Sequence, residues 1–500
     1  MPELWRQNRP GDRMTGVVTA HDEQGNRSAI IFLVFTALLA GLLFPLTGSL
    51  AGTQDGDGVL TALISTQQLT WYFWGQDRLL NIFPAIAAPI QDVEWNLHFQ
   101  IFLRSLCAYL APLGVLVFIQ RNPRVLAAAV AITNIILIVS MSQYAQFNVY
   151  VQHNTFGISL VLFAVSYLVF WSSLPAAARW VLILLICSVA YATNYALLMY
   201  SIPAIIGFGM LRLPEWRRFA SFFAINCVAV LIAKYHAQAF GDPSTAFGLN
   251  FTLEAYPHAF AVLAENLNLP VLSVCAVIAI VCFVSNRQKP VLEFLGVALL
   301  AVAMFILLCG TQWLQTNAYN IRYYITCGIL LTSLMGYAIA VHLVERKRPV
   351  GFLCIAGLVA CLFIPLGGFK SDYDELVNPR WRQDSKEIAK VAHETQARFV
   401  IGGFWDVWPT VFEAEELRDG EPQMVYGGAF RGHALTEEIL ESLRKEPGQN
   451  ALCFLPEVQA CLDELKSNLR TAPEVSFSGS PATAVSVAGK QMIEFKVSVN

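Results

Sequence analysis

Charged side chains are scarce in this sequence. Asp, Glu, Lys and Arg make up 14% of the 500 residues, whereas hydrophobic residues make up 56%, and the mean hydropathy is +0.52. A water-soluble protein cannot bury that much apolar surface, so the composition excludes an ordinary soluble enzyme and indicates a polytopic α-helical membrane protein. The net charge of −3 also argues against a nucleic-acid partner.

Several motifs of common enzymes and transporters are missing as well. The sequence contains no phosphate-cradling glycine-rich loop, no G-x-S-x-G and no H-E-x-x-H, so ATP-driven and common hydrolase mechanisms lack support. No Asp or Glu lies deep inside a predicted span, which argues against the proton relay of an ion-coupled transporter. No cleavable signal peptide is evident, because the first apolar run begins near Ser28 after a polar tail and is expected to stay in the membrane.

The eleven cysteines show no ligand-like spacing. Nine of them lie in or beside apolar runs, where cysteine behaves as a small hydrophobic residue. Only Cys453 and Cys461 share a polar region, and they can form a disulfide if that region faces an oxidising compartment.

Apolar runs recur along most of the chain. About 20 apolar residues are needed for a helix to cross the hydrocarbon core of a bilayer. Eleven runs of roughly this length cover residues 28–46, 101–119, 125–142, 156–173, 180–195, 197–211, 219–236, 269–286, 291–309, 322–343 and 350–367. The fifth and sixth could instead be one long span broken around Asn194 and Pro203.

Lysine and arginine occupy every second connection between these runs. The alternate connections hold almost none, and the pattern works only if 180–211 counts as two spans. The basic residues are Arg6, Arg9, Arg13, Arg27, Arg121, Arg124, Arg179, Arg212, Arg217, Arg218, Arg287, Lys289, Arg346, Lys347 and Arg348. Because cytoplasmic loops carry the excess of positive charge, the amino terminus is expected inside the cell and the carboxyl terminus outside.

Three parts follow from this arrangement: a cytoplasmic tail over residues 1–27, a transmembrane domain over 28–367 that includes a long outer loop at 47–100, and an outer soluble domain over 368–500. In the outer loop, apolar residues recur at helical spacing over 59–64, and aromatic residues follow at 71–74. This pattern predicts helices that lie flat in the membrane interface.

After residue 367 the long apolar runs end, and the tail is predicted to be a soluble α/β domain. Asp384 is expected to cap a helix over 385–395, and Trp405 to Pro409 are expected to form an aromatic loop that faces the membrane or a sugar, or packs against the membrane domain. The other predicted elements are strands at 398–401 and 451–455, helices at 436–446 and 456–467, and a hairpin over 484–499 about Gly489.

Two aspartates follow the first predicted span. Asp55 and Asp57 begin the long outer loop, where positive charge is rare. A carboxylate at the boundary of water and membrane can accept a proton from a hydroxyl, and D-x-D spacing lets two carboxylates bind one divalent cation. Asp and Gly are also the residues that any loop uses to turn, which is the structural alternative. The position of the pair favours the catalytic interpretation.

Four further charged residues lie in the same loop. Asp77 and Arg78 stand next to the aromatic residues, where they either orient a polar substrate or pair with each other at the surface. Asp92 and Glu94 are expected to be solvated loop charges.

Arg322 begins the tenth predicted span on its outer side and is followed by Tyr323. A guanidinium there can form two hydrogen bonds to a phosphate at the depth of the lipid headgroups. The alternative is a snorkelling anchor that touches lipid phosphates. Lys234 and His236, at the outer end of the seventh span, are candidates for the same anion or a leaving group.

Together these features resemble the GT-C superfamily of membrane glycosyltransferases, which includes protein O-mannosyltransferases and aminoarabinose transferases of bacterial envelopes. The shared features are an inside amino terminus, an acid soon after span one, flat helices in the outer loop, Arg322-Tyr323 at the start of a late span and an outer tail domain. The resemblance implies that Asp55 or Asp57 is the catalytic carboxylate, that Arg322 contacts the donor phosphate, and that the donor is a sugar on a polyprenyl phosphate. The stretch 74–78 departs from the best-known families, which leaves the subfamily and the sugar open.

The resemblance therefore implies an inverting glycosyltransferase of the bacterial inner membrane, with the tail domain in the periplasm. The acceptor would be an envelope glycan, lipid or protein, and membrane lipids would surround the spans. No cofactor is required, because a polyprenyl phosphate is already a good leaving group, although a divalent cation could bind Asp55 and Asp57. The competing interpretations are a transporter or flippase of lipid-linked envelope precursors and a non-catalytic envelope assembly protein.

Overall fold

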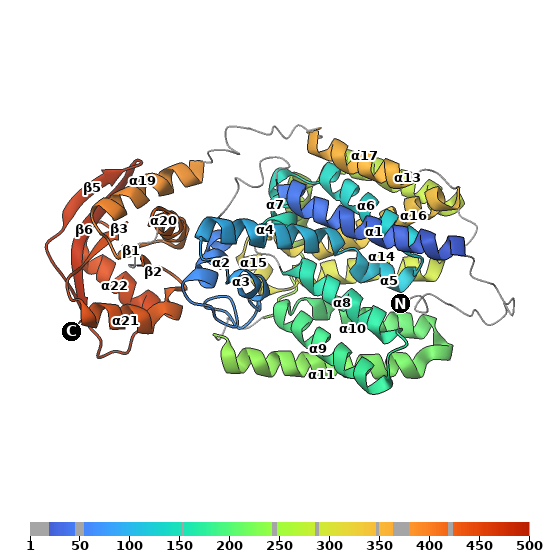
Figure 1. Ribbon diagram of the computed structural model, residues 1–500, viewed down its shortest axis with the longest axis horizontal. Coiled ribbons are helices and arrows are strands. Elements are labelled where there is room, and N and C mark those ends of the chain that lie inside the picture. Colours follow the sequence, from blue (N-terminus) through green and yellow to red (C-terminus); the bar gives the residue numbers. More distant parts are fainter. Residues whose placement is uncertain are drawn as a thin grey trace. The chain divides into compact units, whose positions relative to one another are not determined.

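The computed structural model describes residues 20–45, 55–152, 155–242, 248–285, 290–346, 350–363, 380–418 and 424–499 (Figure 1). The chain divides into two compact units. The first, here the helical unit, comprises residues 1–50, 102–236 and 245–371; the second, here the sheet unit, comprises 51–101, 237–244 and 372–500. The basic residues Arg6, Arg9, Arg13, Arg287, Lys289, Lys347 and Arg348 lie outside the described residues.

Each predicted span coincides with a helix or a pair of helices (Figure 1). The helices are α1 (Ala20–Leu43), α4 (Val93–Leu110) with α5 (Leu113–Ile119), α6 (Pro123–Ser140), α8 (Phe156–Phe170), α9 (Ala176–Thr193), α10 (Leu197–Leu211), α11 (Trp216–Phe240), α13 (Leu269–Ser285), α14 (Val291–Cys309), α16 (Ile325–Glu345) and α17 (Val350–Phe363). Among the described residues, seven helical stretches are long and apolar enough to cross a membrane, and three more apolar helices are shorter. The chain is a polytopic α-helical membrane protein.

Residues 180–211 form two helices rather than one broken span. Helix α9 ends at Thr193, and α10 begins at Leu197 after the extended residue Asn194. Elsewhere in the helical unit, α6 and α16 pack against each other. A Cβ atom at Gly336 would collide with Thr133 and with the carbonyl oxygen of Ala129, so this glycine lets the two helices approach closely.

The tail forms an α/β domain around a six-stranded sheet of order β2-β1-β3-β6-β4, with β5 paired to β6. Strands β1 to β3 are parallel, and β4 to β6 join antiparallel. The strands are β1 (Phe399–Ile401), β2 (Tyr426–Gly428), β3 (Gln449–Cys453), β4 (Phe477–Gly479), β5 (Thr483–Val487) and β6 (Lys490–Val499), and the helices are α19 (Arg380–Glu394), α20 (Phe404–Leu417), α21 (Thr436–Lys445) and α22 (Val458–Leu469). The predicted hairpin about Gly489 is therefore present as β5 and β6. Cys453 and Cys461 are joined by a disulfide, with their Cα atoms 6.2 Å apart.

Three local predictions for the tail are wrong. Asp384 lies inside α19, which is already helical at Arg380, so it does not cap that helix. Trp405 to Pro409 lie in α20 rather than in a loop, and Trp408 is fully buried, because its indole packs inside the sheet unit 5.8 Å from the ring of Trp74. The third strand ends at Cys453, two residues before the predicted end.

The loop that follows the first span contains two helices, α2 (Gly56–Thr66) and α3 (Ile82–Ala87). The predicted helical spacing is present in α2, but Val59, Leu60, Leu63 and Ile64 are all fully buried. Helix α2 packs against α20 and α3 in the sheet unit. Its apolar side chains therefore form part of a protein core rather than an exposed apolar face.

Candidate active site

The two predicted acids lie at the amino-terminal end of α2. Asp55 is the N-cap: its backbone is extended, and its Oδ1 accepts a hydrogen bond of 2.8 Å from the backbone N–H of Gly58. Asp57 lies in the first turn of the same helix. The amino-terminal end of a helix carries partial positive charge, which favours carboxylates at both positions.

Asp57 forms an ion pair with an arginine that the sequence analysis missed. Its Oδ1 lies 2.7 Å from Nη1 of Arg431, and only 16% of the Asp57 side chain and 13% of the Arg431 side chain are exposed. The guanidinium carbon of Arg431 also lies 4.6, 5.1 and 5.6 Å from the ring centroids of Phe73, Phe404 and Phe430. The positive charge is thus held between one carboxylate and three aromatic faces.

This arginine occupies the edge of the sheet where α/β proteins usually bind ligands. Strands β1 and β2 are parallel, and their carboxyl ends lead to Phe404 and to Arg431 respectively. Arg431 has a φ of 77°, which is uncommon for a residue other than glycine and persists only where the surroundings fix it. In this protein, α2 and the loop after it lie against that edge.

Two glycines of the first loop allow this close approach. A Cβ atom at Gly56 would lie 2.8 Å from the Phe404 ring, and one at Gly75 would lie 2.9 Å from Cε1 of His433 and 3.2 Å from Cγ of Arg431. Gly75 also has a φ of 71°, a left-handed backbone conformation that glycine adopts more easily than other residues.

A second pair of side chains, His433 and Asp242, also contacts the loop after α2. His433 Nε2 lies 2.7 Å from Oδ2 of Asp242, and the backbone N–H of Asp242 donates to the carbonyl oxygen of Gln76 over 3.1 Å. Arg470 Nη1 lies 3.7 Å from the other Asp242 oxygen. Segments from three separate parts of the sequence therefore meet around residues 431–433.

Asp77 and Arg78 belong to this loop, but each has a structural neighbour. Arg78 Nε donates a hydrogen bond of 3.2 Å to the side-chain oxygen of Gln76. Asp77 lies against Gly241, where an added Cβ would collide with it. Burial raises the pKa of Tyr72 to about 12, and the negative charge of Asp77 contributes to that rise.

A larger charged cluster surrounds Arg382 on α19. Its guanidinium contacts Glu94 at 2.7 Å, Glu413 at 3.0 Å and Glu416 at 2.5 Å. Lys386 lies 3.7 Å from Glu413. The prediction that Glu94 is a solvated loop charge is therefore wrong, because the tail domain supplies a cation that no local pattern reveals. Burial raises the pKa of the fully buried Glu413 to about 8, although the positive charge of Arg382 opposes that rise.

Arg322 and Tyr323 lie in the helical unit, in the short helix η4 (Ile321–Tyr323). Arg322 Nη2 and Trp313 Nε1 both donate to the Tyr323 hydroxyl, over 3.0 and 2.9 Å. The side chain of Asn320 caps the turn by accepting from the Arg322 N–H, and it donates to the Tyr144 hydroxyl. The guanidinium is therefore oriented by a hydrogen-bonded network, and Trp313 and Tyr144 are members that the sequence analysis did not identify.

Lys234 and His236 lie on α11, with Lys234 exposed and His236 half-buried. Residues two positions apart on a helix do not face each other. Their role as contacts of the donor anion or of a leaving group stays a prediction.

The donor set at Asp55 and Asp57 does not favour a divalent cation. One oxygen of Asp55 accepts a backbone N–H, and one oxygen of Asp57 is paired with a guanidinium, whereas Mg²⁺ and Ca²⁺ need several convergent oxygens. Within the described part of the chain, no group of three or more His, Cys, Asp or Glu side chains could hold a metal ion.

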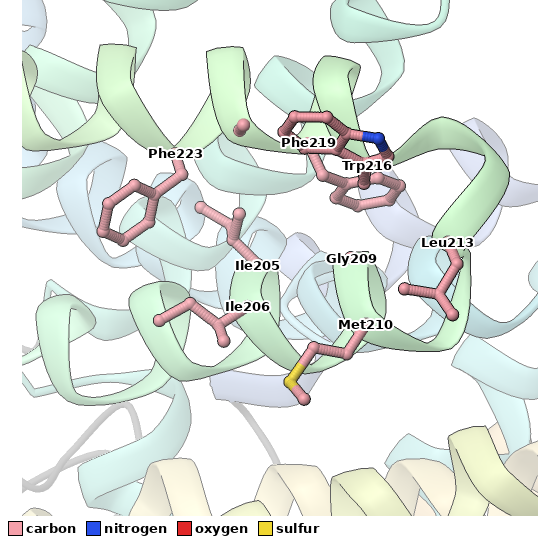
Figure 2. A pocket seen from close by; sticks show the side chains of 9 residues that line it. Ile205, Ile206, Gly209, Met210, Leu213, Trp216, Phe219 and Phe223 are labelled. Carbon is pink, nitrogen blue, oxygen red and sulfur yellow. The ribbon is translucent and has the colours of Figure 1, made fainter.

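The helical unit also contains an apolar pocket of about 210 Å³ (Figure 2). Side chains from α10, such as Ile205, Ile206 and Met210, and from α11, such as Trp216 and Phe223, line it. A site that binds a polar substrate needs polar groups that fix its orientation, and this lining offers almost none.

Comparison with known proteins identifies the fold. No protein-family model matches the chain, and no curated protein matches its sequence. In structure it is similar to ArnT from Cupriavidus metallidurans, which was crystallised bound to undecaprenyl phosphate; the TM-score is 0.50, the identity 12%, and the match covers 93% of this chain and 97% of ArnT. The chain therefore has the fold of ArnT, which is the fold that the resemblance to the GT-C superfamily implies.

Proposed function

We propose that this protein is an integral-membrane inverting glycosyltransferase. It moves a sugar from a polyprenyl-phosphate donor to a hydroxyl of an envelope glycan, lipid or protein. The observation that carries the proposal is the structural match to ArnT, because it extends over nearly the full length of both chains. ArnT was solved with undecaprenyl phosphate bound, which supports a polyprenyl-phosphate donor here.

The chemistry needs one base and one anion site. A carboxylate at the start of α2, from Asp55 or Asp57, accepts the proton of the acceptor hydroxyl as its oxygen attacks the anomeric carbon. The bond between the anomeric carbon and the phosphate oxygen breaks, and its electron pair leaves with the polyprenyl phosphate. Arg322, held by Tyr323, binds the phosphate and stabilises its growing negative charge. A single displacement inverts the anomeric centre.

We further propose that the amino terminus is cytoplasmic and that the tail domain lies in the periplasm, with the spans in the bacterial inner membrane. The alternation of Lys and Arg between spans supports this orientation. The disulfide between Cys453 and Cys461 also supports it, because disulfides persist in oxidising compartments.

The test is sugar transfer by the purified full-length chain in lipid nanodiscs, with polyprenyl-phosphate sugars as donors and envelope extracts as acceptors. The double variant Asp55→Asn/Asp57→Asn is expected to lose about 10²- to 10⁴-fold in rate, the range that one general base supplies.

The matched control is Asp92→Asn, which removes another loop carboxylate whose Oδ1 accepts a backbone N–H, that of Trp95. The control is expected to keep its activity. Equal activity of the double variant and the unmodified chain would contradict the mechanism, and transport of the intact lipid-linked sugar without transfer would favour a flippase.

A further inference from the structure

We infer that Asp57 and Arg431 form a positioning pair that fixes α2 on the tail domain, and that Asp55 is the catalytic base. This inference rests on the proposed function and goes further by assigning different roles to the two aspartates. It also adds Arg431, from the far end of the sequence, to the residues on which catalysis depends.

The first argument is that the Asp57 carboxylate already forms an ion pair with Arg431. A base must present an oxygen to the substrate hydroxyl at hydrogen-bond distance. The Asp57 carboxylate instead meets the Arg431 guanidinium at 2.7 Å, where both side chains are mostly buried. Proton transfer to Asp57 would neutralise its charge and weaken this mostly buried ion pair, which is unfavourable.

The second argument is how firmly Arg431 is placed. Three aromatic rings surround its guanidinium, and they come from the first loop (Phe73) and from the tail domain (Phe404 and Phe430). Its backbone adopts the left-handed conformation that glycine would adopt more easily. The position therefore carries an arginine although its backbone conformation favours glycine, and the contacts of the guanidinium with Asp57 and the aromatic rings are what hold it there.

The third argument is the effect on Asp55. This residue caps the helix whose first turn carries Asp57, and its carboxylate is oriented by the N–H of Gly58. Anything that fixes the start of α2 therefore also fixes the Asp55 carboxylate. A catalytic group displaced by about 1 Å can lose about a hundredfold in rate, so a pair that holds this helix end contributes to catalysis without touching the substrate.

The experiment is a charge reversal in the full-length chain in nanodiscs. Asp57→Asn and Arg431→Gln are each expected to lower kcat by roughly ten- to a hundredfold. The double variant Asp57→Asn/Arg431→Gln should lose no more than either single variant, because both remove the same pair. The reversed pair Asp57→Arg/Arg431→Asp is expected to recover at least part of the lost rate, whereas Asp55→Asn should not be rescued by any change at residue 431.

The pH profile separates positioning from catalysis. If Asp55 is the base, the remaining activity of Asp57→Asn keeps the acidic limb of the unmodified enzyme, since the titrating base is still present. If Asp57→Asn is as inactive as Asp55→Asn, and the reversed pair recovers nothing, Asp57 is the base and the inference is overturned.

A second measurement does not depend on sugar transfer. Amide hydrogen exchange of residues 56–66 should become faster in Arg431→Gln and in Asp57→Asn, and should slow again in the reversed pair. The control is Arg470→Gln, which removes a more exposed arginine near Asp242. Unchanged exchange in the Arg431 and Asp57 variants would refute the positioning pair even if the proposed reaction were correct, and loss of protection would support it even if the donor proved to be different.

Discussion

Three carboxylates, those of Glu94, Glu413 and Glu416, contact Arg382, and Glu413 is the most buried of them. Its side chain is fully buried, and its Oε2 has no hydrogen-bond partner among the described residues, although Lys386 lies 3.7 Å away. Burial raises the pKa of Glu413 to about 8. The folded protein therefore holds a proton on this carboxyl at a pH where the unfolded chain has released it.

This proton predicts a pH dependence of stability. Between the usual pKa of 4.5 and the folded value of about 8, the folded state binds more protons than the unfolded state, so stability falls as the pH rises. The slope is at most roughly 1.4 kcal/mol per pH unit from this one group. We expect the thermal unfolding midpoint of the purified chain to decrease from pH 5 to pH 8.5.

In Glu413→Gln, which cannot ionise, that decrease should be smaller. Glu416→Gln is the comparison variant, because Glu416 binds the same arginine but is 24% exposed. Its carboxylate also helps to raise the pKa of Glu413, so its removal should reduce the decrease by less than Glu413→Gln does. A decrease that is the same in Glu413→Gln as in the unmodified chain would contradict the assignment of the proton to Glu413.

At the scale of elements, the loop after α2 depends on a tight contact at Gly75. Gly75 and Gly489 have similar positive φ values of 71° and 73°, but only Gly75 has a neighbour that an added Cβ would strike; around Gly489 nothing lies within 4 Å. Alanine variants at the two positions therefore distinguish the cost of a strained backbone from the cost of a steric clash.

We expect Gly489→Ala to destabilise the sheet unit by about 1–2 kcal/mol, the strain of a left-handed alanine. In Gly75→Ala the free energy of unfolding should fall by about 1–3 kcal/mol more than in Gly489→Ala, because the methyl group must displace His433 or Arg431. Denaturant unfolding of the full chain, followed by tryptophan fluorescence, measures both. Equal losses in the two variants would show that the contact with residues 431–433 contributes little.

The elements also show what the sequence could and could not predict. The spans and the hairpin about Gly489 are predicted correctly because their signals are local: a run of apolar residues, or an alternation about a turn. The ion pair of Asp57 joins residues 374 positions apart, so no periodicity leads from one to the other. The position of α20 was missed because Trp408-Pro409 has the composition of a loop, whereas burial of the indole decides its conformation.

At the scale of the whole molecule, the disulfide gives a test of orientation. Cys453 and Cys461 close a short loop in the tail domain, and removal of such a bond destabilises a protein by about 2–3 kcal/mol. If the tail lies outside the cytoplasm, the two thiols should be oxidised in intact cells. A maleimide of high mass should then modify Cys453 and Cys461 only after reduction.

The double variant Cys453→Ser/Cys461→Ser provides the control, because its other cysteines report the background labelling. Free thiols at both positions in freshly lysed, alkylated cells would contradict a periplasmic tail. Oxidised thiols would support the orientation that the Lys and Arg pattern predicts.

The sheet unit is assembled from residues 51–101, 237–244 and 372–500, which has a consequence for biogenesis. During synthesis, α2 leaves the ribosome long before α20, the helix that buries it, has been translated. Until then, side chains such as Val59 and Leu60 have no completed core to enter. A chain that stopped after α17 would therefore contain the helices that match the predicted spans, yet the apolar side chains of α2 would lack the helix that buries them.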